Sequence, residues 1–308
     1  MKRSITLATV AAAAAVMLLL SGCSASGSSA AGAPTSGAAA YSSLAGTSGC
    51  AALRKANPTL VGKTLKNAIN PHTPGYEAID PNDPSKYQGF DIDLGEAIGA
   101  CLGFSVSYVP VSFAELIPTL SSGQADWVIS DLYATTERAA NVDFVTYSKV
   151  FDGVLVAKNN PKKLTGINTS LCGTTVALNQ GFVEVPLVQA LGPDCKAKGL
   201  AAPQVSLFGN NADCVQAILA GRADSYINDV NTVNAFVKEH PAELSKATAV
   251  TLPYKIGIGV PQNDLTFRKA VSDALTLVQK SGLQATLTKK WALDQNALDA
   301  PTILTTKS

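Results

Sequence analysis

The chain has 308 residues, enough for one large domain or two ordinary ones, and its 46% hydrophobic and 15% charged residues exclude a disordered chain and a coiled coil. The 24 Lys and Arg residues nearly balance the 23 Asp and Glu residues, so the basic excess typical of nucleic-acid-binding proteins is missing. Two His residues, and six Cys residues without C-x-x-C spacing, argue against a metal site. We therefore predict no cofactor and no nucleic-acid partner.

The N-terminus has the pattern of an export signal. Lys2 and Arg3 precede a long, uncharged apolar run, as in a signal peptide. Residues 20–23 read Leu-Ser-Gly-Cys, which resembles the lipobox of bacterial lipoproteins, where the chain is cut before the Cys and its thiol is diacylated. We expect residues 1–22 to be a signal peptide and Cys23 to anchor the protein to the outer face of the cell membrane. The alternatives are ordinary secretion and an uncut membrane-spanning helix.

The next segment has the composition of a linker. Residues 24–49 are almost wholly Ser, Ala, Gly and Thr and carry no charge. Such a segment cannot form a core or a persistent helix by itself. We therefore expect residues 23–56 to be a lipidated Cys followed by a flexible tether, or a plain disordered tail if Cys23 is not acylated.

From residue 64 onward, short apolar runs alternate with amphipathic segments in two successive series. The predicted strands are Leu65–Ile69, Ser105–Val109, Trp127–Ser130, Val154–Ala157, Val176–Leu178, Val205–Phe208, Ser225–Ile227 and Ile256–Val260. The predicted helices are Ile92–Leu102, Phe113–Leu120, Val183–Leu191, Asp213–Ala220, Val230–Val237, 265–280 and 283–291. This alternation is typical of parallel sheets covered by helices on both faces, and two series predict two α/β lobes.

An ordered set of motifs runs through both series. In chain order the motifs are Gly89–Leu94, Ser112–Leu120, Ser122–Asp126, Thr135–Ala139, Val142–Phe144, Ala220–Asp224 followed by Asp229, and Tyr254–Val260. Their order and spacing resemble the polar amino-acid solute-binding proteins, family 3, of bacterial ABC importers, in particular lipoproteins of an actinobacterial kind. The resemblance covers residues 60 to 292.

The resemblance implies an α/β, two-lobed periplasmic-binding-protein fold of type II. Each lobe is a mostly parallel sheet flanked by helices, and two hinge crossings allow the lobes to close on a ligand. Carried over, lobe 1 comprises residues 57–157 and 253–308, and lobe 2 comprises residues 158–252. The crossings are expected near residues 156–158 and 252–254. In open α/β sheets the ligand crevice lies beyond the carboxyl ends of the strands.

Two charged residues match ligand-binding positions of that family. The resemblance implies that Arg138 binds the ligand carboxylate, which a guanidinium can do bidentately. It also implies that Asp229 accepts the ligand ammonium group. The alternatives are a surface ion pair of Arg138 with Glu137 or Asp143, and a helix N-cap role for Asp229.

Other candidate ligand-binding residues depart from the family pattern. Asp131 and Tyr133 replace small or hydroxyl residues. A carboxylate at Asp131 favours a cationic group on the ligand, unless it pairs with a protein cation or caps the next turn. Gly181 matches a glycine that opens a lobe-2 helix, but Phe182 and Val183 replace hydroxyl donors, so that only a backbone contact is expected there.

Aromatic residues complete the predicted site. Tyr76 aligns with an aromatic wall residue of the family. Phe113 is a second candidate for the wall, with core packing as its alternative, whereas Trp127 is expected in the core.

An exported protein should pair its cysteines. Cys172 and Cys195 have the spacing of a disulfide of actinobacterial relatives, and Cys50 with Cys101 is the second predicted pair. Cys214 lies at an apolar helix position and is expected to be a buried thiol.

These observations predict an extracytoplasmic, lipid-anchored, monomeric receptor that captures a small zwitterion, an amino acid or a derivative, and delivers it to an ABC permease. We predict that it is not an enzyme. One alternative is a dehydratase of cyclohexadienyl acids on the same fold, for which Glu184 or Asp131 would supply the general acid. The other is a ligand-sensing ectodomain with a separate signalling partner.

Overall fold

The computed structural model describes residues 37–306, with side chains from residue 41 onward. The predicted signal peptide and Cys23 lie outside the described residues. Among the residues that are described, no helix combines the length and the apolar composition needed to cross a bilayer.

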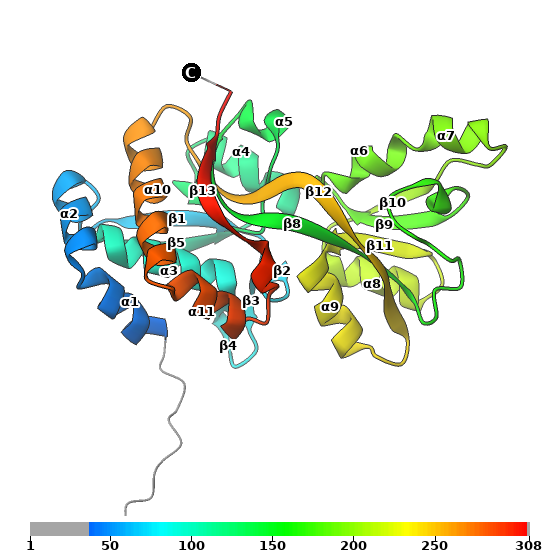
Figure 1. Cartoon of the computed structure of the whole chain (residues 1–308), viewed down its shortest axis with the longest axis horizontal. Coiled ribbons are helices and arrows are strands. Elements are labelled where there is room, and N and C mark those ends of the chain that lie inside the picture. The colour runs from blue at the N-terminus through cyan, green and yellow to red at the C-terminus, as the bar shows by residue number, and fades with distance from the viewer. Residues whose placement is uncertain (1–36, 307–308) are drawn as a thin grey trace, which may run out of the picture. The chain divides into compact units, whose positions relative to one another are not determined.

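One sheet of ten strands runs through both lobes (Figure 1). Its strand order is β10-β9-β11-β8-β12-β6-β1-β5, with β13 beside β8 and β7 beside β12. The strands are β1 (Thr64–Ile69), β5 (Ser105–Pro110), β6 (Trp127–Val128), β7 (Tyr133–Ala134), β8 (Asp143–Ala157), β9 (Thr175–Asn179), β10 (Gln204–Phe208), β11 (Ser225–Asp229), β12 (Leu244–Val260) and β13 (Leu298–Leu304). Strands β5-β1-β6 of lobe 1 and β10-β9-β11 of lobe 2 pair in parallel, which matches the predicted fold class.

Helices cover the faces of this sheet (Figure 1). They are α3 (Phe90–Leu102), α4 (Leu116–Ser121), α5 (Thr136–Ala139), α6 (Glu184–Gln189), α7 (Gly192–Ala197), α8 (Asn211–Leu219), α9 (Val230–Glu239), α10 (Leu265–Lys280) and α11 (Leu283–Lys290). Short 3₁₀ turns lie at Phe113–Glu115, Thr169–Leu171 and Gln295–Ala297. A separate antiparallel sheet contains β2 (His72–Thr73), β3 (Glu77–Asp80) and β4 (Asp83–Gln88). Each lobe has its own apolar core, with Trp127 completely buried in lobe 1 and Leu155 in lobe 2.

The first crossing between the lobes lies earlier than predicted. Strands β8 and β12 run antiparallel to each other from one lobe to the other. Residues 152–156 of β8 already pair with β11 of lobe 2, whereas residues 143–148 pair with the part of β12 that belongs to lobe 1. The crossing therefore precedes Asp152 instead of following Val156. A register shift in β12 between Thr251 and Lys255 lies opposite this segment.

The prediction that residues 24–49 hold no persistent helix, and that residues 23–56 form a flexible tether, is wrong for the part that the structure describes. Helices α1 (Gly37–Ala45) and α2 (Ser48–Ala56) lie there. Leu44 is buried in the lobe-1 core, and the Tyr41 hydroxyl donates to Asp93 Oδ1 of α3 at 2.6 Å. Tertiary packing supplies the stability that the small residues lack as an isolated helix.

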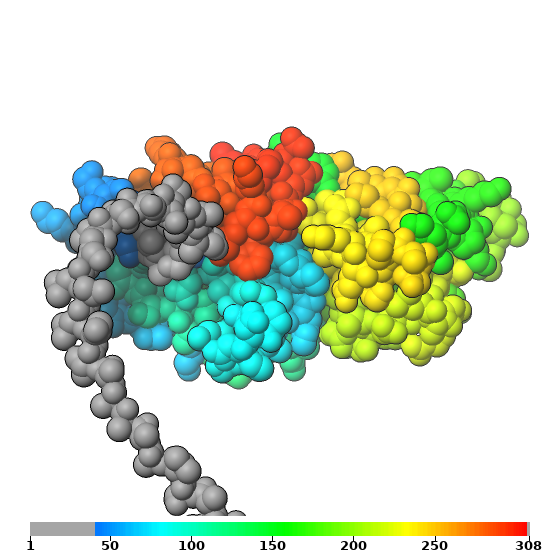
Figure 2. All heavy atoms as spheres, turned by 90° about the horizontal axis from the view of Figure 1, so that it is seen from below, coloured from blue at the N-terminus to red at the C-terminus, as the bar shows by residue number. Residues whose placement is uncertain are grey.

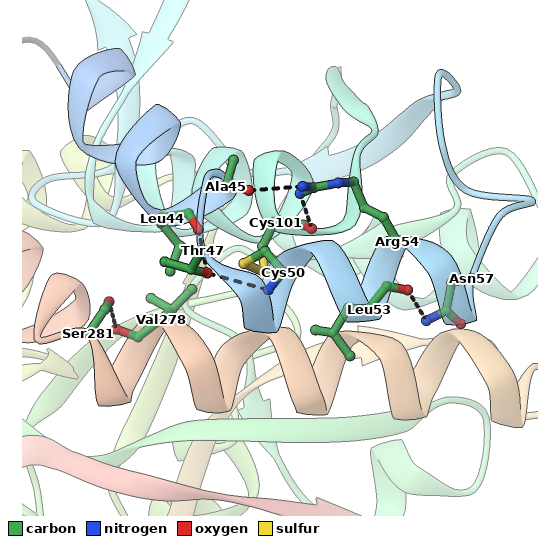
Figure 3. The surroundings of a disulfide bond; sticks show 10 residues. All are labelled: Leu44, Ala45, Thr47, Cys50, Leu53, Arg54, Asn57, Cys101, Val278 and Ser281. Atoms are coloured by element: carbon green, nitrogen blue, oxygen red, sulfur yellow. Dashed lines mark hydrogen bonds between the residues drawn. A yellow bond between two sulfur atoms is a disulfide. The ribbon is translucent and has the colours of Figure 1, made fainter.

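A disulfide between Cys50 and Cys101 joins α2 to α3 (Figure 3). The Arg54 guanidinium reinforces this junction, because it donates to the carbonyl oxygens of Cys101 and Ala45. The second predicted disulfide, Cys172 to Cys195, is also present. Cys214 is the free cysteine of the described part of the chain, and it is buried as predicted.

Candidate ligand-binding site

A cavity lies between the lobes. Its lining residues come from loops and strand ends of both lobes: Thr73, Phe113, Asp131, Tyr133, Arg138, Phe182, Val183, Glu184 and Asn228. The structure thus brings five of the eight predicted ligand-binding residues to one cavity, while Tyr76, Gly181 and Asp229 lie outside its lining.

Asp131 follows β6 and is held in a left-handed backbone conformation, with φ at 42°. Asp91, in the first turn of α3, fixes this conformation, because its Oδ2 accepts the Asp131 backbone N–H at 2.6 Å. Asp91 is itself held by the Tyr147 hydroxyl, which donates to its Oδ1 at 2.6 Å. The Asp131 side chain is 5% exposed, and its Oδ1 has no hydrogen-bond partner within the described part of the chain.

Arg138, in the short helix α5, spans the cavity. Its Nη1 donates to the Tyr133 carbonyl oxygen at 2.7 Å, and its Nη2 donates to the Gly181 carbonyl oxygen of lobe 2 at 2.8 Å. The guanidinium also lies 5.3 Å from the centre of the Phe113 ring. The alternative of an ion pair with Glu137 or Asp143 is not realised in the described part of the chain, where Asp143 pairs with Arg268. Phe113 therefore faces the cavity as one wall and is not purely a core residue.

The lobe-2 wall is a tight turn after β9. Gly181 has a φ of 85°, and a Cβ atom there would approach the Ala114 Cα of lobe 1 to 3.0 Å. A glycine is needed because the turn both adopts this conformation and comes so close to lobe 1. The next side chain, Phe182, packs edge-on against Phe113 with ring centroids 4.6 Å apart. The two lobes are therefore in contact at the cavity.

Asp229 caps helix α9, as its alternative interpretation predicted. Its Oδ1 accepts the Asn231 backbone N–H at 2.8 Å and the Asn231 side-chain amide at 3.0 Å. Asn231 also donates to the Tyr76 hydroxyl at 3.1 Å, so Tyr76 is a buried lobe-1 residue that contacts lobe 2. Burial and the nearby charge of Asp152 raise the pKa of Asp229 to about 7.

Two further buried carboxyl groups lie beside these residues. Glu184 begins α6 and lines the cavity; the sequence indicated it only as a possible general acid. Asp152, opposite Asp229 in the β8–β11 register, was missed, although an acidic residue in an apolar strand is itself a signal. Its Oδ1 accepts the Tyr133 hydroxyl at 3.0 Å, and burial together with the nearby charge of Glu184 raises the pKa of the Asp152 carboxyl group. Burial raises the pKa of both carboxyl groups.

No group of three or more His, Cys, Asp or Glu side chains with the arrangement of a metal site occurs among the described residues.

Residues 65–294 match the bacterial extracellular solute-binding proteins, family 3. The chain belongs to this family. The chain is similar to a "Probable histidine-binding protein" of Neisseria gonorrhoeae, with 29% identity over 80% of this chain and 88% of the relative. It also resembles "ABC transporter arginine-binding protein 1" of Escherichia coli (strain K12), with 27% identity over 71% of this chain and 86% of the relative.

Solved structures agree with the family 3 assignment. "An ancestral arginine-binding protein bound to arginine" has a TM-score of 0.68 and 28% identity, and the match covers 74% of this chain and 97% of that one. The "ancestral amino acid-binding protein AncCDT-1, a precursor of cyclohexadienyl dehydratase" has a TM-score of 0.61 and 26% identity, over 78% and 99% of the two chains. These relatives are binding proteins by name, and this family 3 chain is likewise a binding protein and not an enzyme.

Proposed function

We propose that this family 3 protein captures an amino acid between its lobes and passes it to the permease of an ABC transporter. The observation that carries the proposal is the position of Arg138, whose guanidinium belongs to lobe 1 but reaches the Gly181 turn of lobe 2 across the cavity. Its relatives include proteins named as arginine- and histidine-binding, which supports an amino-acid ligand.

In this proposal the two poles of the amino acid are held by different lobes. Three of the five guanidinium N–H groups of Arg138 are not used by the carbonyl oxygens of Tyr133 and Gly181, and they bind the ligand carboxylate. Asp229 accepts the ligand ammonium group with the oxygen that does not cap α9. Phe113, Phe182 and Tyr133 enclose the ligand.

Ligand binding then stabilises the closed arrangement of the lobes. The contacts of Arg138 with Gly181 and of Phe113 with Phe182 exist only while the lobes are close. A ligand that touches both walls shifts the population toward this closed state. The permease would recognise the closed receptor, which acts as a monomer whose two lobes are joined by β8 and β12.

Calorimetric titration with the twenty amino acids tests this function. We expect at least one to bind, and we expect Arg138→Ala to weaken its binding by about 3 kcal/mol, because the variant leaves the ligand carboxylate unpaired in a buried site. Glu137→Gln, an exposed change in the same short helix, is the matched control. Unchanged affinity in Arg138→Ala would refute the assignment of the carboxylate contact.

The lipid anchor at Cys23 and the location on the outer face of the cell membrane are parts of the same proposal. They are supported by the sequence around Cys23. Two acyl chains hold a protein stably on a membrane. Cys23→Ala should therefore release the protein into the medium, and its retention in the membrane fraction would contradict a lipid anchor.

A further inference from the structure

Asp91 opens helix α3 at a place that the lobe-1 backbone fixes. Two residues before it, Gly89 has a φ of 143°, and a Cβ atom there would lie 2.0 Å from the Tyr76 carbonyl oxygen, so only glycine fits. The same carbonyl oxygen accepts the Asp91 backbone N–H at 3.0 Å. The Asp91 side chain is completely buried and does not line the cavity. The glycine thus places a buried carboxylate at a fixed point beside the cavity wall.

Both oxygens of the Asp91 carboxylate are used within lobe 1. Its Oδ2 accepts the Asp131 backbone N–H, and its Oδ1 accepts the Tyr147 hydroxyl, each at 2.6 Å. Tyr147 lies on β8, is completely buried, and has its own carbonyl oxygen bonded to the Gln284 side chain at 3.0 Å. A hydrogen bond to a carboxylate is stronger than one to a neutral acceptor. Tyr147 therefore orients Asp91, and Asp91 holds the backbone of residue 131.

The backbone of residue 131 needs such a bond. Its φ of 42° lies in the left-handed region, which a residue with a Cβ atom adopts only at a cost in free energy. A non-glycine residue stays there when its surroundings impose the conformation. The bond from the Asp131 N–H to Asp91 is the contact that imposes it.

Three groups of the cavity depend on this turn. The Asp131 side chain and the Tyr133 side chain both line the cavity. The Tyr133 carbonyl oxygen accepts Arg138 Nη1 at 2.7 Å, so the turn also sets where the guanidinium lies. A change in the backbone at residue 131 would therefore displace a carboxylate, an aromatic wall and a cation together.

We propose that Asp91 is a positioning residue of the ligand site. It does not touch the ligand, but through the backbone of residue 131 it sets the places of Asp131, Tyr133 and Arg138. The effect on ligand affinity rests on the proposed function, whereas the effect on the backbone does not.

Backbone chemical shifts of residue 131 in the unliganded protein test the effect on the backbone. In Asp91→Ala we expect residue 131 to leave the left-handed region. In Asp91→Asn we expect it to stay there, because the amide oxygen can still accept the Asp131 N–H and the amide nitrogen can donate to the Tyr147 hydroxyl. Unchanged shifts in Asp91→Ala would overturn the proposal, whether or not any amino acid binds.

Titration calorimetry tests the effect on affinity, with the amino acid that binds most tightly among the twenty as the probe. Asp91→Ala should weaken its binding about tenfold, whereas Asp91→Asn should stay within about twofold of the wild type. The matched control is Asp143→Ala, because Asp143 is an equally buried lobe-1 carboxylate that pairs with Arg268. It should lower the melting temperature but keep the affinity. Equal losses of affinity in Asp91→Ala and Asp143→Ala would show general destabilisation and refute a positioning role.

Tyr147→Phe gives a second test that does not depend on the folding of Asp91→Ala. It keeps the buried ring and removes only the hydroxyl that orients Asp91. It should weaken binding about threefold, and it should add nothing to Asp91→Ala in the double variant, because both changes act through the same bond. Wild-type affinity in Tyr147→Phe, or additive losses in the double variant, would contradict the proposal.

The two proposals can fail separately. If no amino acid binds, the proposed function fails, while the chemical shifts of residue 131 still decide whether Asp91 positions this turn. If an amino acid binds and Asp91→Ala keeps the wild-type affinity, only the positioning role of Asp91 fails.

Discussion

Asn231 connects the two lobes at the back of the cavity. From helix α9 of lobe 2, its side-chain amide donates to the Tyr76 hydroxyl at 3.1 Å, and its Oδ1 accepts the Asp294 backbone N–H at 2.9 Å. Figure 2 shows this meeting of surfaces, where the red C-terminal segment lies against the yellow α9 region. Asn231→Ala removes both contacts between the lobes.

The size of the effect follows from these two hydrogen bonds. A net contribution of about 0.5–1.5 kcal/mol each gives about 1–3 kcal/mol in favour of the closed state. Losing them should raise the open-to-closed ratio by about 5- to 150-fold. The affinity for the ligand should fall by no more than this factor, apart from the loss of the bond between Asn231 and Asp229.

Small-angle X-ray scattering of the unliganded protein measures the change. We expect Asn231→Ala to have a larger radius of gyration than the wild type, and saturating ligand should bring the two values together. Asn234→Ala is the matched control, because Asn234 lies on the same helix, is exposed, and accepts its hydrogen bond from Lys246 within lobe 2. The same radius for the unliganded wild type and Asn231→Ala would show that these contacts do not control closure.

Two further predictions concern stability and pH. Removing the Cys50–Cys101 disulfide, which spans 51 residues, should lower the free energy of unfolding by about 4 kcal/mol. Removing Cys172–Cys195, which spans 23 residues, should lower it by about 3 kcal/mol. Denaturant titration of the two double Ala variants measures both losses, and a loss below about 1 kcal/mol would contradict the loop-entropy reasoning. The pKa of Asp229 is raised to about 7, above the value of an Asp in an unfolded chain. Between pH 4 and 7 the folded protein therefore binds more protons than the unfolded chain, and the unliganded protein should become more stable as the pH falls through about 7. Binding of the ligand ammonium group requires the ionised Asp229 carboxylate and should weaken over the same range. Calorimetry at pH 8 and pH 5 checks the sign, and affinity that rises toward pH 5 would contradict it.

The alternation of strands and helices was readable from local hydrophobic patterns. The strands predicted at 65–69, 105–109 and 176–178 all occur, as does the helix predicted at 265–280. Each of these segments buries one face, and the spacing of its own apolar residues predicts that face. The small sheet β2–β4 and strand β13 were missed, because their partners rather than their composition determine their pairing.

The N-terminal helices could not be predicted from the amino-acid composition of their segment. Nothing in the run of Ala, Ser and Gly before Cys50 predicts a helix, yet α1 and α2 pack on the lobe-1 core and are held by a disulfide and by Tyr41. The stability of these helices comes from contacts with residues that are distant in the sequence, and a local pattern cannot predict such contacts.

For the candidate site, the sequence alone predicted the family, the guanidinium of Arg138 as a ligand contact, and the unusual carboxylate at Asp131. Only the tertiary structure shows the contacts made when the lobes close. Arg138 donates to the Gly181 carbonyl oxygen, and Glu184 lines the same cavity as Asp131. Asp152, on the crossing strand β8, accepts the Tyr133 hydroxyl. The reason is that each of these pairs lies on separate elements, and their distance depends on how β8 and β12 bring the lobes together rather than on spacing along the chain.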